Sequence, residues 1–195
     1  MKLLQNLIIL NVINLSLVWG IDFTPAPVSS HSFGSLNIGW LHSTITGVQS
    51  NEVLQDYKST RNAMLFGLKR GLILTEQKNL LLNAWIDGSA GRENKNGLYN
   101  FSLGGQIGYR FFGGRVIAFV GGGFEMGNLA MADPKEQYNI YGGIARAEMF
   151  VDIAQGYGLS VGYTRGFNEK SKKLLGEHFD TQSFYVSISY YDFSL

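Results

Sequence analysis

The segment from Asn100 to Tyr109 alternates between two kinds of side chain, and this alternation constrains the fold of the chain more than any other feature. Phe101, Leu103 and Ile107 are bulky and apolar, whereas the residues at the even positions are polar or glycine. Successive side chains of a β-strand point to opposite faces of a sheet, so a period of two predicts an amphipathic strand. Similar segments recur along the chain and predict an all-β protein.

The connections between the predicted strands alternate in length. We expect eight strands, at residues 33–45, 59–75, 80–90, 97–111, 115–127, 138–153, 157–167 and 180–193. Longer, charged connections at 46–58, 91–96, 128–137 and 168–179 alternate with short turns at 76–79, 112–114 and 154–156. Bacterial outer-membrane barrels have long extracellular loops and tight periplasmic turns. The pattern therefore predicts that both ends of the strand-forming chain lie on the periplasmic side.

The two faces of the predicted strands differ in polarity. In the strand at 138–153, Ala147 and Met149 share one face, while Arg146 and Glu148 share the other. An apolar outer face and a polar interior suit a barrel in lipid, whereas a water-soluble barrel needs an apolar interior. We therefore predict an eight-stranded antiparallel up-and-down transmembrane β-barrel, with a soluble ligand-binding barrel as the alternative.

The first 20 residues have the pattern of a signal peptide. Lys2 is followed by a largely apolar run, and Gly20 is a small residue at a plausible cleavage point. We expect residues 1–20 to be removed and residues 21–195 to form the barrel domain; the alternative is an uncleaved N-terminal membrane anchor. The remaining chain has equal numbers of acidic and basic residues, so no nucleic-acid partner is expected, and it contains no cysteine.

The end of the chain, from Phe184 to Leu195, is an alternating aromatic segment. With the predicted architecture, it makes the chain resemble the small eight-stranded bacterial outer-membrane barrels, including the OmpA transmembrane domain, the OmpX and Ail group and the opacity proteins. The resemblance implies a monomer in contact with outer-membrane lipids and lipopolysaccharide, whose last strand is read by the outer-membrane assembly machinery. Proteins of this group typically end in a phenylalanine that forms part of the signal for the assembly machinery, whereas this chain ends in Leu195. The apolar phase also shifts between Ile188 and Tyr191. These two differences predict either a bulge in the last strand or an assembly signal displaced by two residues.

Several charged residues fall on the predicted interior face. They are Lys69, Arg110, Glu125, Arg146 and Glu148, with Asp87, Asn37, Asn83 and Gln106 on the same face. Isolated buried charges are costly, so these side chains must pair with one another. An eight-stranded barrel is only wide enough to be filled by side chains, and we therefore expect a structural plug rather than an ion path. With Lys69 inside, Arg70 points toward lipid near the periplasmic boundary.

No catalytic, cofactor-binding or metal-binding residues are predicted. The histidines His31, His42 and His178 are scattered, although His42 next to Ser43 allows a comparison with the barrel enzymes that edit lipid A. Catalysis by such residues requires a base and an orienting group that are held together. No cofactor is expected.

The outer loops are the remaining candidates for function, because exposed loops on a rigid scaffold commonly carry recognition. Lys170, Lys172 and Lys173 could contact lipopolysaccharide phosphates or an acidic host surface, or could form a merely solvated loop. The sequence thus favours a non-catalytic role in envelope integrity or surface interaction, with a host or envelope ligand. The alternatives are a narrow porin or small-apolar-solute channel, and a lipid A-modifying enzyme.

Overall fold

The computed structural model of the chain describes residues 32–49, 52–74, 79–93, 96–112, 115–130, 137–154, 156–171 and 174–192. The predicted signal peptide and the rest of the chain before residue 32 lie outside these ranges. Eight strands fill nearly all of the described chain. They are β1 (Ser32–Gln49), β2 (Glu52–Ile73), β3 (Leu80–Glu93), β4 (Asn96–Phe111), β5 (Val116–Ala130), β6 (Gln137–Ala154), β7 (Tyr157–Ser171) and β8 (Leu174–Asp192).

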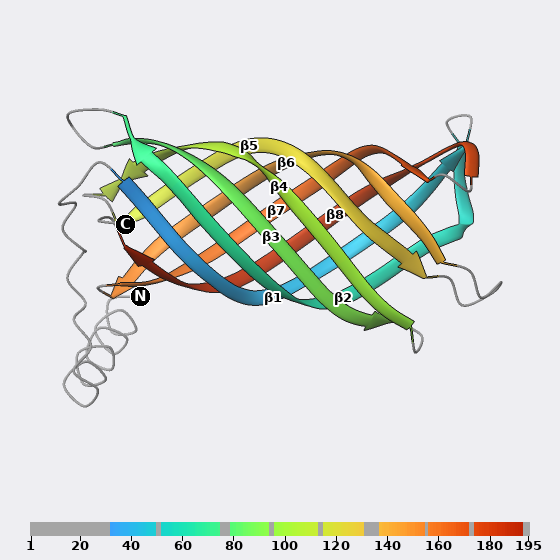
Figure 1. Cartoon of the computed structure of the whole chain (residues 1–195), viewed down its shortest axis with the longest axis horizontal. Helices are drawn as coiled ribbons and strands as arrows, with labels where there is room; N and C mark the ends of the chain where they lie inside the picture. The colour runs from blue at the N-terminus through green and yellow to red at the C-terminus, as the bar shows by residue number, and fades with distance from the viewer. Residues whose placement is uncertain are drawn as a thin grey trace, which may run out of the picture.

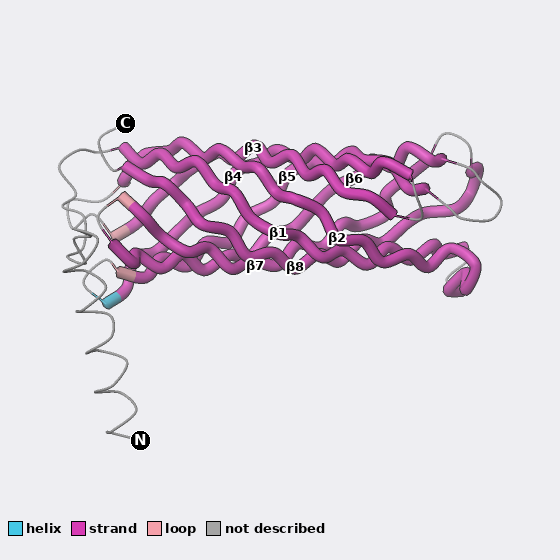
Figure 2. The backbone as a smooth tube through the Cα atoms, turned by 90° about the horizontal axis from the view of Figure 1, so that it is seen from below, coloured by secondary structure: helices cyan, strands magenta, loops and turns pink. Residues whose placement is uncertain are grey.

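Each strand pairs antiparallel with the next, and β1 pairs with β8, so the sheet closes into a barrel (Figure 1). This confirms the predicted eight-stranded antiparallel barrel. Closure leaves no unpaired sheet edge among these strands. Gly34 near the start of β1 pairs with Asp192 at the end of β8, so the first and last strands meet at one end of the barrel. We call this the turn end and the opposite one the loop end; Figure 2 shows the long axis that joins them.

Several strands extend farther toward the loop end than predicted. The expected loop at 46–58 is mostly strand, because β1 continues to Gln49 and β2 begins at Glu52, with a register shift between Thr46 and Gly47. The expected loop at 168–179 is likewise mostly strand. The sequence predicts loops in these segments because they contain polar and charged side chains. Such side chains do not end an antiparallel ladder while both backbones continue to pair.

Side chains alternate between the exposed outer surface and the buried interior. In β4, Phe101 is 39% exposed and Ile107 is 52% exposed, whereas Gln106 between them is 1% exposed. The other strands repeat this arrangement, so large apolar side chains cover the outside of the barrel. No helix in the described part of the chain is long and apolar enough to span a membrane.

A cluster of apolar side chains packs in the interior at the turn end, which the sequence does not predict. Phe150 lies at the centre of this cluster, with its ring 6.2 Å from that of Phe33 and 5.1 Å from that of Tyr191, both edge to face. We call the whole group the apolar cluster; its members are Phe33, Ile73, Leu81, Ile117, Phe119, Phe150 and Tyr191. Such packing fills the lumen where the barrel is too narrow for water and side chains together.

The bulge predicted between Ile188 and Tyr191 is wrong, whereas a displaced signal would involve residues beyond Asp192 that the structure does not describe. The register between β1 and β8 runs without a shift as far as Asp192, with Ile188 and Tyr190 exposed and Tyr191 buried. The apolar phase appeared to change because Tyr191 is an aromatic member of the interior cluster rather than of the outer surface. Phe193 and Leu195 lie outside the described residues.

Candidate functional site

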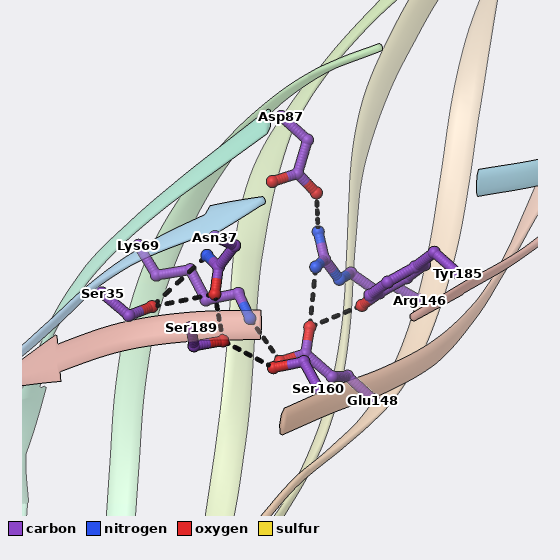
Figure 3. Close-up of polar contacts among 9 residues, drawn as sticks. All are labelled: Ser35, Asn37, Lys69, Asp87, Arg146, Glu148, Ser160, Tyr185 and Ser189. Carbon is purple, nitrogen blue, oxygen red and sulfur yellow. Dashed lines mark hydrogen bonds and ion pairs between the residues drawn. The ribbon is translucent and has the colours of Figure 1, made fainter. Parts of the chain in front are cut away.

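A layer of charged side chains crosses the lumen next to the apolar cluster. Strand alternation turns Lys69 of β2, Asp87 of β3, and Arg146 and Glu148 of β6 inward at a common level (Figure 3). The two residues on β6 are separated by one position, so they share a face and lie beside each other. We call these four residues the ion-pair layer.

Glu148 is the centre of the ion-pair layer. Its Oε1 accepts a hydrogen bond from Nζ of Lys69, and its Oε2 accepts one of 2.7 Å from Nη2 of Arg146. The other terminal nitrogen of Arg146 donates to Oδ2 of Asp87. Lys69 is 3% exposed, and Arg146 and Glu148 are each 4% exposed. Two cations and two carboxylates give the layer a formal charge of zero, which satisfies the requirement that buried ions be paired.

Tyrosine and tryptophan rings complete the surroundings of Arg146. The Cζ atom of Arg146 lies 4.6 Å from the centre of the Trp85 ring and 4.9 Å from that of Tyr185. Tyr185 also donates a hydrogen bond of 2.5 Å from its hydroxyl to Oε2 of Glu148. The guanidinium is therefore held by carboxylates through its edge and by aromatic rings through its faces.

Neither aromatic residue was among the predicted site residues. The signal that could have found Tyr185 is its phase, because the alternation of Ser183, Ser187 and Ser189 marks its face of β8 as the interior. All three serines are buried. Trp85 similarly shares the interior phase of β3 with Asp87.

Small polar residues adjoin the ion-pair layer. The Ser189 hydroxyl donates a hydrogen bond of 2.5 Å to Oδ1 of Asn37, and Ser189 also lies 3.2 Å from the Ser160 hydroxyl (Figure 3). The amide nitrogen of Asn37 donates to Ser35 at 3.4 Å. These hydrogen bonds tie β1, β7 and β8 together inside the lumen.

The structure separates two of the predicted interior residues from this layer. Glu125 is buried, but the described contact of its carboxylate is a 3.4 Å hydrogen bond from Thr181. Glu125 lines a small cavity of about 20 Å³ on the loop-end side of the ion-pair layer. Arg110 is half-buried at the turn end, where it interacts electrostatically with Asp152. The five predicted charges thus occupy three places in the lumen, and only Lys69, Arg146 and Glu148 meet.

The predicted loop lysines do not form a described site. Lys170 belongs to β7, where its backbone pairs with Tyr141 and His178. Lys172 and Lys173 lie outside the described residues. Any contact surface made by these three side chains therefore stays a prediction.

The structure separates the side chains of His42 and Ser43, which the sequence analysis compared with those of lipid A-editing enzymes, while His31 lies outside the described residues. His42 lies on the outer face, with Nδ1 2.9 Å from Oδ1 of Asn62 and its ring stacked on Trp40. Ser43 points into the lumen and is 2.7 Å from the Ser183 hydroxyl. The two neighbours thus face opposite sides of the sheet. Within the described ranges, no group of three or more His, Cys, Asp or Glu side chains could hold a metal ion.

No protein-family model and no curated protein matches the sequence. Among solved structures, Ail, the attachment invasion locus protein of Yersinia pestis, has a TM-score of 0.52 at 10% identity, covering 83% of this chain and 99% of Ail. Ail in complex with the heparin analogue sucrose octasulfate gives 0.50 at 11% identity, with the same coverage. Neisserial surface protein A gives 0.49 at 9% identity, covering 80% of this chain and 96% of that one. The chain therefore has the fold of the small eight-stranded outer-membrane barrels. Sequence identities this low show a shared fold and no shared function.

Proposed function

We propose that this chain is a monomeric integral protein of the bacterial outer membrane, exported by a cleaved signal peptide at residues 1–20, with a non-catalytic role in envelope integrity or surface interaction. The observation that carries the proposal is the polarity of the barrel, which exposes large apolar side chains and buries its ion pairs. Burial of apolar surface is worth about 25 cal/mol per Å², so such an exterior is unfavourable in water. A lipid environment removes that penalty.

Aromatic residues on the outer surface support a membrane location. Tyr109, Phe111, Tyr157 and Tyr190 are exposed near the turn end, where Tyr157 and Tyr190 contact each other with ring centres 5.5 Å apart. Tyr99, Phe167 and Phe184 are exposed nearer the loop end. Aromatic girdles at both interfaces are typical of outer-membrane barrels.

A closed lumen supports a non-conducting barrel. The apolar cluster occupies the interior at the turn end. The ion-pair layer crosses the lumen next to this cluster, on its loop-end side. An ion would have to displace paired charges and then pass through packed aromatic and aliphatic side chains. This arrangement favours the structural plug over the alternative of a narrow porin. Steady conductance of the purified protein in a planar bilayer would favour the porin.

The opposite directions of His42 and Ser43 support a non-catalytic role. The lipid A-modifying alternative has a direct assay, in which the purified barrel is incubated with lipopolysaccharide and the acyl chains are measured by mass spectrometry. We expect unchanged acyl chains, and an altered acyl pattern would establish the enzyme instead.

The loop end is the proposed contact region. Ail has been solved with the heparin analogue sucrose octasulfate, so a barrel of this fold can hold a sulfated ligand. Lys170, Lys172 and Lys173 would supply positive charge for an anionic host or envelope ligand of this chain. Reversal of these three charges should weaken binding to heparin-coated beads or lipopolysaccharide. Unchanged binding would discard the lysines as the contact.

Membrane fractionation followed by electrophoresis with and without heating tests the proposal as a whole. The protein should float with outer membranes and should migrate faster before heating than after it, because a closed barrel resists detergent unfolding. Recovery in a soluble fraction without detergent would instead establish the water-soluble barrel.

A further inference from the structure

Arg70 is an exposed cation on the apolar outer surface of the barrel. It lies on β2 three residues before the end of the strand at Ile73, and its outward-facing neighbours on that strand are Leu68 and Leu72. It makes no hydrogen bond or ion pair with the side chains that the structure describes, which in β8 end at Tyr191. A guanidinium inside an apolar, lipid-facing band is unfavourable unless an anion or water reaches it.

A surface hollow adjoins this arginine. Gly34 of β1 pairs with Arg70 and occupies an outward position without a side chain, while Leu36 on the same face pairs with Leu68 of β2 and with Tyr190 of β8. The resulting hollow measures about 240 Å³, and its lining includes Gly34, Leu36, Leu68, Arg70 and Tyr190. The lining also includes Ser35 and Lys69, which are buried, so Arg70 is the exposed cation of a mostly apolar hollow.

We propose that this hollow binds a phospholipid of the leaflet at the turn end, with the lipid phosphate on Arg70 and an acyl chain against Leu36 and Leu68. The guanidinium offers parallel N–H donors that match the oxygens of a phosphate. The leucines match an acyl chain, which a free phosphate ion lacks. Tyr190 lies at the rim, a position typical of tyrosine at a membrane interface. The site rests on the proposed membrane location, because the outer face must meet lipid.

Arg165 provides a matched control. It is also exposed on the outer face, on β7, but its Cζ atom lies 5.3 Å from the centre of the Phe167 ring, and it does not line the hollow. A nonspecific attraction between surface arginines and anionic lipid would involve Arg165 as much as Arg70.

Native mass spectrometry of the folded barrel in mild detergent can count bound lipids. The probes are phosphatidylglycerol, diacylglycerol without a phosphate, and inorganic phosphate. We expect one phosphatidylglycerol per barrel for the wild type and for Arg165→Gln, and an affinity about tenfold lower for Arg70→Gln, which corresponds to about 1.4 kcal/mol. Diacylglycerol and inorganic phosphate should each fail to displace the bound lipid at equal concentration.

The Asp192→Asn variant tests whether a carboxylate of the chain itself binds Arg70. Gly34 of β1 pairs with Arg70 of β2 on one side and with Asp192 of β8 on the other. In Asp192→Asn, phosphatidylglycerol binding should be equal to or stronger than that of the wild type, and a loss like that of Arg70→Gln would overturn the proposal. Equal lipid binding by Arg70→Gln and the wild type would also overturn it. Because all variants are compared as folded barrels with heat-dependent mobility, such a result would leave the outer-membrane location standing.

Discussion

Tyr185 reaches across Gly162 to donate its hydroxyl hydrogen to Glu148. The three residues are in register on adjacent strands, with Glu148 of β6 opposite Gly162 of β7 and Gly162 opposite Tyr185 of β8. Any side chain on β7 at this level would occupy the path of the ring, since a Cβ atom there would collide with it. The contact therefore links two strands that share no backbone ladder, and it depends on a glycine between them.

Removal of the Tyr185 hydroxyl should weaken the barrel without removing the ring beside Arg146. Hydrogen bonds to charged groups contribute about 1.5–3 kcal/mol, so Tyr185→Phe should lower the free energy of unfolding by about 2 kcal/mol. Urea titration of the barrel in lipid vesicles measures this change. Tyr163→Phe, at an exposed position on β7, is the matched control and should be neutral. Equal stabilities for Tyr185→Phe and the wild type would show that the hydroxyl does not serve Glu148.

Loss of the Glu148 charge should be more damaging, because Lys69 would lose its ion pair and Arg146 would keep only the one with Asp87. Breaking a buried ion pair by removing one partner costs about 3–5 kcal/mol, so Glu148→Gln should reduce resistance to urea by roughly that amount. Addition of Lys69→Met restores a neutral layer and should recover part of the loss. A double-mutant cycle reports the coupling, and strictly additive effects would contradict the pairing of Lys69 with Glu148.

Gly162→Ala should destabilise the barrel through Tyr185. The new methyl group would have to displace the ring, and overpacking of this kind costs roughly 1–3 kcal/mol. The cost should shrink in a Tyr185→Ala background, where the obstacle is gone. Gly143 of β6 is the matched control, because a Cβ atom there meets nothing within 4 Å. A Gly143→Ala variant as unstable as Gly162→Ala would point to backbone effects rather than to the ring.

The strand count, the closure and the direction of the side chains could be predicted because a period of two is a local property. The alternation at Phe101 and Leu103 is visible without knowledge of any other strand. Strand ends were less accessible, since the polar residues of β1 and β2 near the loop end resemble a loop in the sequence. Their backbones nevertheless continue to pair.

Partners inside the lumen could not be read from the sequence. Lys69 on β2 and Glu148 on β6 meet only because of the stagger of strands around the barrel, which no local pattern encodes. The same stagger sends Glu125 and Arg110 to other levels. Phase did identify which charges face inward, but it left open which of them pair. Trp85 and Tyr185 have the interior phase of their strands, but phase alone does not show that their rings pack on Arg146.

The ion-pair layer and the apolar cluster follow each other along the lumen, and this order predicts how conductance responds to substitution. The ion-pair layer adjoins the apolar cluster, with Nζ of Lys69 6.0 Å from the centre of the Phe119 ring. Glu148→Gln removes a charge from the ion-pair layer but leaves Phe33, Phe119 and Phe150 packed in the apolar cluster. We therefore expect no steady conductance in planar bilayers from either the wild type or Glu148→Gln, with Phe119→Ala also closed because the rest of the cluster remains. Conductance that rises in Glu148→Gln alone would show that the charged layer is the gate, and conductance of the wild type would favour the narrow channel over the plug.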